Sequence, residues 1–171
     1  NIASIMNQRK RKKMTTKSRW NGLLVGAFKR PKKWQLQKPL TFQTNLCDDE
    51  IDFIQSCGVK VRITSTGKIT VPVGYVTDMA SVPRACWAFI APFDVARPAV
   101  VHDVLYEKIN AVRSEVSSSD FKRLRAIADH VFFDAMGQTD PVVASWKKYS
   151  AYYAVRMFGW SAIKTSAKRE W

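Results

Sequence analysis

The spacing of apolar residues changes once along the chain, and this change limits the fold more than any other feature of the sequence. In "VKVRITSTGKITVPVGYVTD", residues 59–78, apolar and polar side chains alternate on both sides of "STGK", whose residues favour a turn. From Pro98 onward the apolar residues recur at helical spacing. Strands followed by helices indicate an α+β fold, in which a small antiparallel hairpin or sheet packs against about three helices.

Start and stop signals divide the second half of the chain into those three predicted helices. "PAVVHDVLYEKINAV" begins with a proline, which suits a first helical turn. "SSSDFKRLRAIADHVFFDAMG" offers a serine or Asp120 as its N-cap and Gly137 as its end. "DPVVASWKKYSAYYAVRMFGW" offers Asp140 as N-cap, Pro141 in the first turn and Gly159 as its end.

The part of the chain before the hairpin carries weaker signals. "WQLQKPLTFQT", residues 34–44, alternates and contains a proline, which predicts an edge strand. The acidic "CDDEIDF" predicts a loop or a short helix. Cys47, Cys57 and Cys86 share no C-x-x-C spacing, so we expect reduced, packed thiols rather than disulfides or a zinc ribbon.

Length and hydropathy favour one domain in a cytosol-like compartment. The chain has 171 residues, of which 46% are hydrophobic, which is enough to build one core. No stretch approaches the roughly 18 uncharged apolar residues of a membrane span. The N-terminus also lacks the apolar segment of a secretory signal.

The net charge of +14 is concentrated at the N-terminus. Residues 1–33 carry eleven Lys and Arg and no acidic side chain, whereas residues 34–171 carry seventeen basic and fourteen acidic side chains, a net charge of +3. Because such a segment repels itself and buries little, we predict an extended basic arm over 1–33 and one α+β domain over 34–171. We expect the arm to bind nucleic-acid phosphates or an acidic protein surface. Its predicted partner-binding side chains are Arg9, Lys10, Arg11, Lys12, Lys13, Lys17, Arg19, Lys29, Arg30, Lys32 and Lys33.

Three motifs in the second half of the chain carry a family resemblance. "VPVGYVTDMASVPRACWAFIAPFDVARPAVVHDVLYEK" is followed by "ADHVFFDAMG" and then by "YYAVRMFGW". Over about residues 59–160 this order of motifs resembles a phage and prophage family, domain of unknown function 1353. The resemblance implies a bacteriophage or prophage origin but brings no established activity. The motif positions in this chain are Asp78, Ser81, Pro83, Arg84, His102, Asp103, Tyr106 and Asp129.

These motif residues are expected to meet at one place. His102 and Tyr106 are four residues apart and share a helix face, while Asp103 is turned about 100° away from His102. If the first two predicted helices are antiparallel neighbours, Asp129 reaches His102 and orients its ring, as a carboxylate does behind a catalytic or metal-bound histidine. Asp78, at the end of the hairpin, would face the same point.

The first interpretation of this cluster is a buried polar network that holds the hairpin, the following loop and two helices together. Within such a network each lost partner leaves a polar group unsatisfied, at a cost of about 1–3 kcal/mol. The members of the predicted network are Asp78, Ser81, Arg84, His102, Tyr106 and Asp129.

The second interpretation is hydrolytic. "HD" followed three residues later by Tyr, with Asp on the next helix, is similar to the calcium-dependent secreted phospholipases and to the phospholipase domain of parvovirus capsids. The similarity implies that His102 activates water, that Asp103 holds calcium, and that Tyr106 and Asp129 orient the histidine. Residues 79–99 contain no glycine, so the glycine-rich calcium loop of those enzymes is missing, as are the disulfides of the secreted members.

The third interpretation is a site for zinc or a similar ion. Its ligands would be Asp78, His102 and Asp103, with His130 as a further candidate. Two histidines and no paired cysteines supply few ligands, and His130 has a simpler partner in Asp134, one turn later. We therefore expect no cofactor, with a divalent zinc or calcium ion as the alternative.

The third predicted helix is rich in aromatic residues that favour either a core or a protein interface. Trp146, Tyr149, Tyr153 and Trp160 recur near helical spacing. Together with the basic arm, they favour a virion protein of the bacteriophage head-to-tail connector, tail or capsid, assembled in the host cytoplasm. Its partners would be other virion proteins in a multi-subunit assembly, or packaged nucleic acid. The alternatives are a metal-dependent hydrolase that acts on lipid or cell wall through a His-Asp centre, and a nucleic-acid-binding accessory protein.

Overall fold

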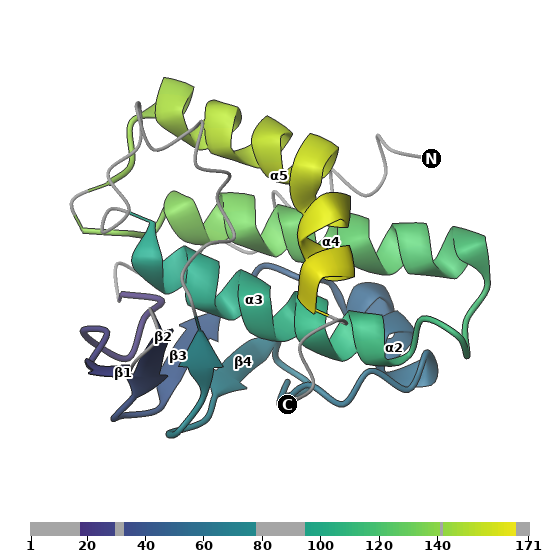
Figure 1. The fold of residues 1–171 in the computed structure, drawn as a ribbon, viewed down its shortest axis with the longest axis horizontal. Helices are drawn as coiled ribbons and strands as arrows, with labels where there is room; N and C mark the ends of the chain where they lie inside the picture. Colours follow the sequence, from purple (N-terminus) through teal and green to yellow (C-terminus); the bar gives the residue numbers. More distant parts are fainter. Residues whose placement is uncertain (1–17, 30–32, 78–94, 141, 167–171) are drawn as a thin grey trace.

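Two small antiparallel sheets lie beside a stack of helices, as a computed structural model of the chain shows (Figure 1). The structure describes residues 18–29, 33–77, 95–140 and 142–166, with side chains up to Met157. Helix α3 packs against strand β4 on one side and against α4 on the other, and α5 packs on α4. The predicted α+β class is confirmed.

One sheet has the order β1–β2–β5 and the other pairs β3 with β4, and every pairing is antiparallel. Strand β3 shows the period of two that a half-buried strand requires, because Leu40 and Phe42 are buried while Thr41 and Gln43 are half-buried. The strands are β1 (Gly26–Lys29), β2 (Lys33–Leu36), β3 (Leu40–Gln43), β4 (Lys68–Val71) and β5 (Val76–Thr77).

The structure contains four described helices, and the acidic segment forms the shortest of them, with Glu50 closing a capping box on Cys47. Ser117 caps α4, since its hydroxyl accepts a hydrogen bond from the backbone of Asp120, and Gly137 ends that helix as predicted. The short connection between α3 and α4 makes them antiparallel neighbours (Figure 1). The helices are α2 (Asp48–Ser56), α3 (Ala96–Ala111), α4 (Ser118–Met136) and α5 (Ser145–Ser166).

The strand pairing differs from the predicted hairpin. Residues 64–67 do form the turn, with Gly67 at φ 80°, but the two predicted arms pair only over a short stretch, through an antiparallel bridge from Ile63 to Ile69 and backbone hydrogen bonds from Thr64 to Lys68 and from Thr70 to Arg62. Strand β4 instead forms its ladder with β3, and the predicted edge strand over 34–44 is two strands that belong to different sheets. Alternation identifies a strand but not its partner, because partner choice depends on packing between distant segments.

The boundaries predicted for the third helix are wrong at both ends. Helix α5 begins at Ser145 rather than near Asp140, and the hydroxyl of Thr139 accepts a hydrogen bond from the backbone of Val143 at 3.2 Å. The helix continues past Gly159 to Ser166, and its final part turns away from its first part (Figure 1). A single glycine costs only about 1 kcal/mol inside a helix and therefore does not have to end it.

The boundary predicted for the basic arm is also too late, because residues 18–29 belong to the folded domain. Trp20 is buried and bridges to Phe42, with ring centroids 4.5 Å apart. Strand β1 pairs with β2, where Lys29 stands opposite Lys33. The other basic residues predicted to bind partners, residues 9–17, 30 and 32, lie outside the described residues.

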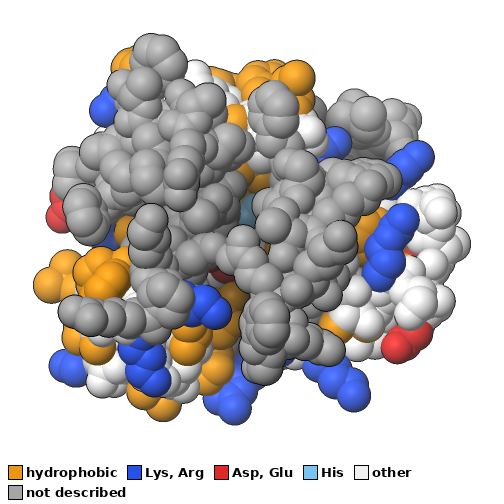
Figure 2. Space-filling model, viewed as in Figure 1, with side chains coloured by type: hydrophobic (Ala, Val, Ile, Leu, Met, Phe, Trp, Pro, Cys, Tyr) orange, Lys and Arg blue, Asp and Glu red, His pale blue; other side chains and the backbone are white. Residues whose placement is uncertain are grey.

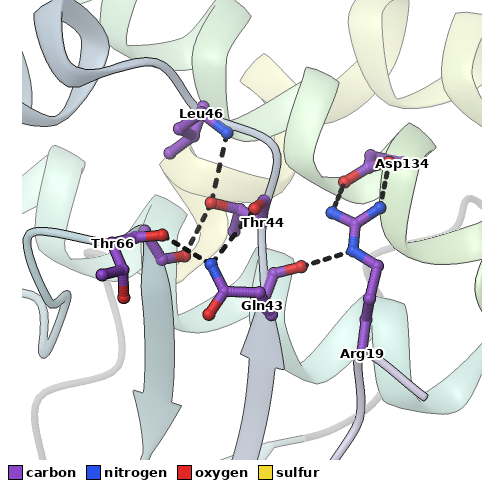
Figure 3. Close-up of polar contacts among 7 residues, drawn as sticks. Arg19, Gln43, Thr44, Leu46, Thr66 and Asp134 are labelled. Carbon is purple, nitrogen blue, oxygen red and sulfur yellow. Dashed lines mark hydrogen bonds and ion pairs between the residues drawn. The ribbon is translucent and has the colours of Figure 1, made fainter. Parts of the chain in front are cut away.

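Arg19 is committed to an internal ion pair rather than to a partner. Its guanidinium donates two parallel hydrogen bonds to the carboxylate of Asp134 on α4, one of them 2.8 Å long, and Nε donates to the carbonyl of Gln43 at 2.6 Å (Figure 3). Only 7% of the Arg19 side chain and 12% of the Asp134 side chain are exposed. Arg19 therefore ties the N-terminal segment to both β3 and α4.

None of the helices in the described ranges combines the length and the apolar character that crossing a membrane requires. Cys47 and Cys57 are free thiols, as predicted, and burial raises the pKa of each. Cys86 lies outside the part of the chain that the structure describes.

Candidate active site

The antiparallel packing of α3 on α4 places a histidine and a tyrosine opposite one buried carboxylate. His102 Nε2 lies 3.1 Å from Asp129 Oδ1, and the Tyr106 hydroxyl donates to the same oxygen at 2.5 Å. The sequence prediction that Asp129 reaches His102 from the next helix is confirmed.

The imidazole of His102 packs against two aromatic rings. The centroid of the Tyr106 ring is 4.1 Å from that of His102, and the centroid of Phe132 is 5.0 Å away. Only 2% of His102 is exposed. The ring is therefore fixed in position by packing as well as by its hydrogen bond to Asp129.

Asp129 receives a third partner from α5. Arg156 Nη1 donates to Asp129 Oδ2 at 3.1 Å, while Asp129 itself is fully buried. Burial alone would raise the pKa of Asp129, but the hydrogen bonds from His102, Tyr106 and Arg156 outweigh it and lower the pKa below its ordinary value. The carboxylate is therefore ionised at neutral pH.

The charge of Asp129 decides which nitrogen of His102 carries the proton. An ionised carboxylate can only accept hydrogen bonds, so Nε2 of His102 must be the donor. In the neutral ring Nδ1 then has a free lone pair, and among the described residues it has no hydrogen-bond partner. The arrangement leaves one basic nitrogen available inside the protein.

Tyr106 acts as a donor in this cluster rather than as a second base. Burial and the neighbouring Asp129 carboxylate raise the pKa of Tyr106. The hydroxyl therefore keeps its proton across the ordinary pH range and continues to donate to Asp129.

Asp103 points elsewhere, as its position on α3 predicted. Its Oδ2 accepts a hydrogen bond from the Thr77 hydroxyl on β5 at 2.6 Å. This contact connects the end of the three-stranded sheet to α3, one residue after His102. The described contacts place Asp103 beside the His102–Asp129 pair rather than in it.

The remaining predicted residues are not brought into this cluster by the described contacts. Asp78, Ser81, Pro83 and Arg84 lie outside the described residues. His130 follows Asp129 and is turned about 100° away on α4. Asp134, predicted as a partner of His130, accepts two hydrogen bonds from Arg19.

Sequence reasoning missed the role of Arg156. The residue lies in "YYAVRMFGW", one of the motifs that carry the family resemblance, so the position could have been noticed. Its partner could not have been predicted from the sequence, because Arg156 and Asp129 are 27 residues apart and their contact depends on how α5 crosses α4.

Comparison with known proteins agrees with the sequence resemblance. The family model described as "Protein of unknown function (DUF1353)" matches residues 56–155, more than half of the chain. The match includes His102, Tyr106, Asp129 and the first part of α5. It ends at residue 155, directly before Arg156. No curated protein and no solved structure significantly matches the chain.

Proposed function

Because the chain belongs to the DUF1353 family, whose function is unknown, we propose its activity from the site itself: it is a hydrolase in which His102 activates water. The observation that carries the proposal is the hydrogen bond between His102 Nε2 and the ionised Asp129, while Nδ1 of the same ring has no hydrogen-bond partner among the described residues. General bases in hydrolases are commonly oriented in this way by a buried carboxylate.

The proposed step is a simple proton transfer coupled to attack. His102 Nδ1 takes a proton from water while the water oxygen adds to an electrophilic carbonyl carbon. The same proton then passes to the leaving oxygen as its bond to the carbon breaks. Asp129 stabilises the imidazolium that forms between these two events, and Tyr106 and Arg156 keep that carboxylate ionised and in place.

The substrate class proposed is a carboxylic ester of a phospholipid. The spacing of His102, Asp103 and Tyr106, with Asp129 on the neighbouring helix, is similar to that of calcium-dependent phospholipases. The geometry of the cluster supports the same substrate class, because Oδ1 of Asp129 accepts hydrogen bonds from both His102 and Tyr106.

A calcium or zinc site is not complete within the described residues. In the described ranges no group of three or more His, Cys, Asp or Glu side chains could hold a metal ion. Asp103 is the described candidate ligand nearest to His102 in the sequence, and its Oδ2 already accepts from Thr77. The proposed proton transfer uses only protein side chains and water, and metal dependence stays a prediction.

The test is hydrolysis of phospholipid esters by the purified full chain and by the His102→Gln variant, with calcium and with a chelator. We expect the variant to lose about 10²–10⁴-fold in rate, because removing a general base typically has that effect. The matched control is His130→Gln, which changes the other histidine, on α4 directly after Asp129. Equal activity of wild type and His102→Gln would exclude His102 as the catalyst, provided that circular dichroism shows both to be folded.

A second candidate function is a structural role in a bacteriophage particle, and the three-stranded sheet favours it. Apolar side chains in and beside this sheet are exposed, and β1 is an edge strand of the described sheet. Exposed apolar clusters and free strand edges are typical of protein-binding surfaces. The exposed residues are Leu23, Val25, Phe28, Val73 and Val76.

Mass spectrometry of purified particles from a host that carries the gene tests this second function. A virion component is expected to copurify with the particles at a fixed stoichiometry. The Phe28→Ser variant is expected to be depleted from them, whereas Lys68→Ser, which changes an exposed side chain of the other sheet, is not. A chain that is abundant in the lysate but absent from the particles contradicts the structural role.

A further inference from the structure

Helix α5 has large apolar side chains on the face opposite to the one that packs on the domain. Ala151, Ala154 and Val155 are buried and lie on its inner face. On the opposite side, four large side chains recur every three or four residues and are between 51% and 72% exposed. These four residues, here called the α5 stripe, are Trp146, Tyr149, Tyr153 and Met157.

The α5 stripe extends toward the preceding loop and onto α4. Val142 comes just before the helix and is 68% exposed. Phe133 on α4 contacts Tyr149, with ring centroids 5.1 Å apart. Hydrophobic side chains are visible at the surface over α5 at the top of Figure 2. A helix that is apolar on two opposite faces is normally covered on both, and the described residues leave one of these faces of α5 exposed.

The charges around the stripe point to the kind of surface that covers it. The sequence of α5 places Lys147 and Lys148 between Trp146 and Tyr149 and contains no acidic residue, and the whole chain carries a net charge of +14. Lysine is depleted in protein interfaces. Helices that lie in a membrane interface, in contrast, combine aromatic and aliphatic residues with lysine and arginine. Tryptophan and tyrosine also concentrate at the level of lipid headgroups.

We propose that the α5 stripe docks the protein on an anionic lipid bilayer. The aromatic rings and Met157 enter the headgroup region, and the basic side chains beside them meet the lipid phosphates. This proposal goes beyond the proposed hydrolysis and does not require it, because the stripe is a property of α5 alone.

Cosedimentation of the full chain with vesicles tests the proposal. One set of vesicles is phosphatidylcholine and the other is phosphatidylcholine with phosphatidylglycerol. We expect binding to the anionic vesicles, and we expect the double variant Trp146→Ser/Tyr153→Ser to lower the partition coefficient by about tenfold or more. The matched control is Phe28→Ser, which removes an equally exposed aromatic side chain from β1.

All variants retain the basic N-terminal residues. A difference in vesicle binding between the double variant and the Phe28→Ser control therefore reports the α5 stripe and not the N-terminal charges. Wild type and Phe28→Ser are expected to bind alike, and added salt is expected to weaken both. Equal binding of wild type and the double variant would overturn the proposal, because the N-terminal charges would then account for it. A wild-type dimer that the double variant converts to a monomer would overturn it as well, since a second copy would then cover α5. Loss of hydrolysis with vesicle binding intact would contradict only the proposed enzyme.

Discussion

Asp129→Ala is expected to lower the free energy of unfolding by about 3–5 kcal/mol, which is the usual cost of removing one partner from a buried ionic cluster. Asp129 is fully buried and accepts hydrogen bonds from His102, Tyr106 and Arg156. Its loss strands two buried donors and removes the counter-charge of the arginine. Urea denaturation at neutral pH measures the effect, and Asp140→Ala, which removes an exposed carboxylate, is the control.

The same variant has a defined pH signature. The pKa of Asp129 is lower in the folded protein than the ordinary value of 3.8, so the folded state binds its proton less readily than the unfolded state. The stabilisation is therefore complete above about pH 5 and is lost as the pH falls through the folded pKa. We expect the stability difference between wild type and Asp129→Ala to shrink below about pH 4. A difference that stays constant down to pH 2 would mean that the carboxylate charge does not stabilise the fold.

Arg19→Met is expected to lower the free energy of unfolding as much as Asp129→Ala does, by about 3–5 kcal/mol. Arg19 lies outside the residues that match the family model. The variant leaves the carboxylate of Asp134, whose side chain is 12% exposed, without its guanidinium and removes a hydrogen bond to Gln43. Methionine keeps most of the aliphatic packing, so the loss reports the ion pair. Thermal and urea denaturation measure it, with Lys29→Met as the control on an exposed position of β1.

A double variant makes this second prediction sharper. Arg19→Met/Asp134→Leu removes both charges, and we expect it to recover much of the stability, because apolar pairs often replace buried ion pairs at little cost. If Arg19→Met alone is no worse than Lys29→Met, the N-terminal segment does not contribute to the stability of the domain.

Periodicity and caps predicted much of α3 and α4 from the sequence. Alternation before residue 78 and helical spacing after Pro98 gave the fold class, and Ser117 and Gly137 marked the ends of α4. The His102–Asp129 contact followed from the same reasoning. His102 and Tyr106 share one face of α3, and antiparallel packing of α3 and α4 was enough to place Asp129 opposite that face. These features depend on local sequence or on a short connection.

The features that the sequence did not predict depend on contacts between distant segments. Strand β4 pairs with β3, and Arg19 pairs with Asp134, 115 residues away. Nothing in a run of basic residues identifies Arg19 as a partner of Asp134, because that contact depends on how distant segments of the chain pack. The contact of Arg156 with Asp129 is also one that the sequence did not predict. The motif that contains Arg156 was identified, but its partner depends on the path of α5 across α4.

Arg156 also joins two parts of the described structure. Its helix, α5, carries the exposed stripe, and its guanidinium donates to the same carboxylate that accepts from His102 and Tyr106. If binding at the stripe moves α5, Arg156 is the side chain through which that movement reaches Asp129, and any such coupling acts equally in both directions.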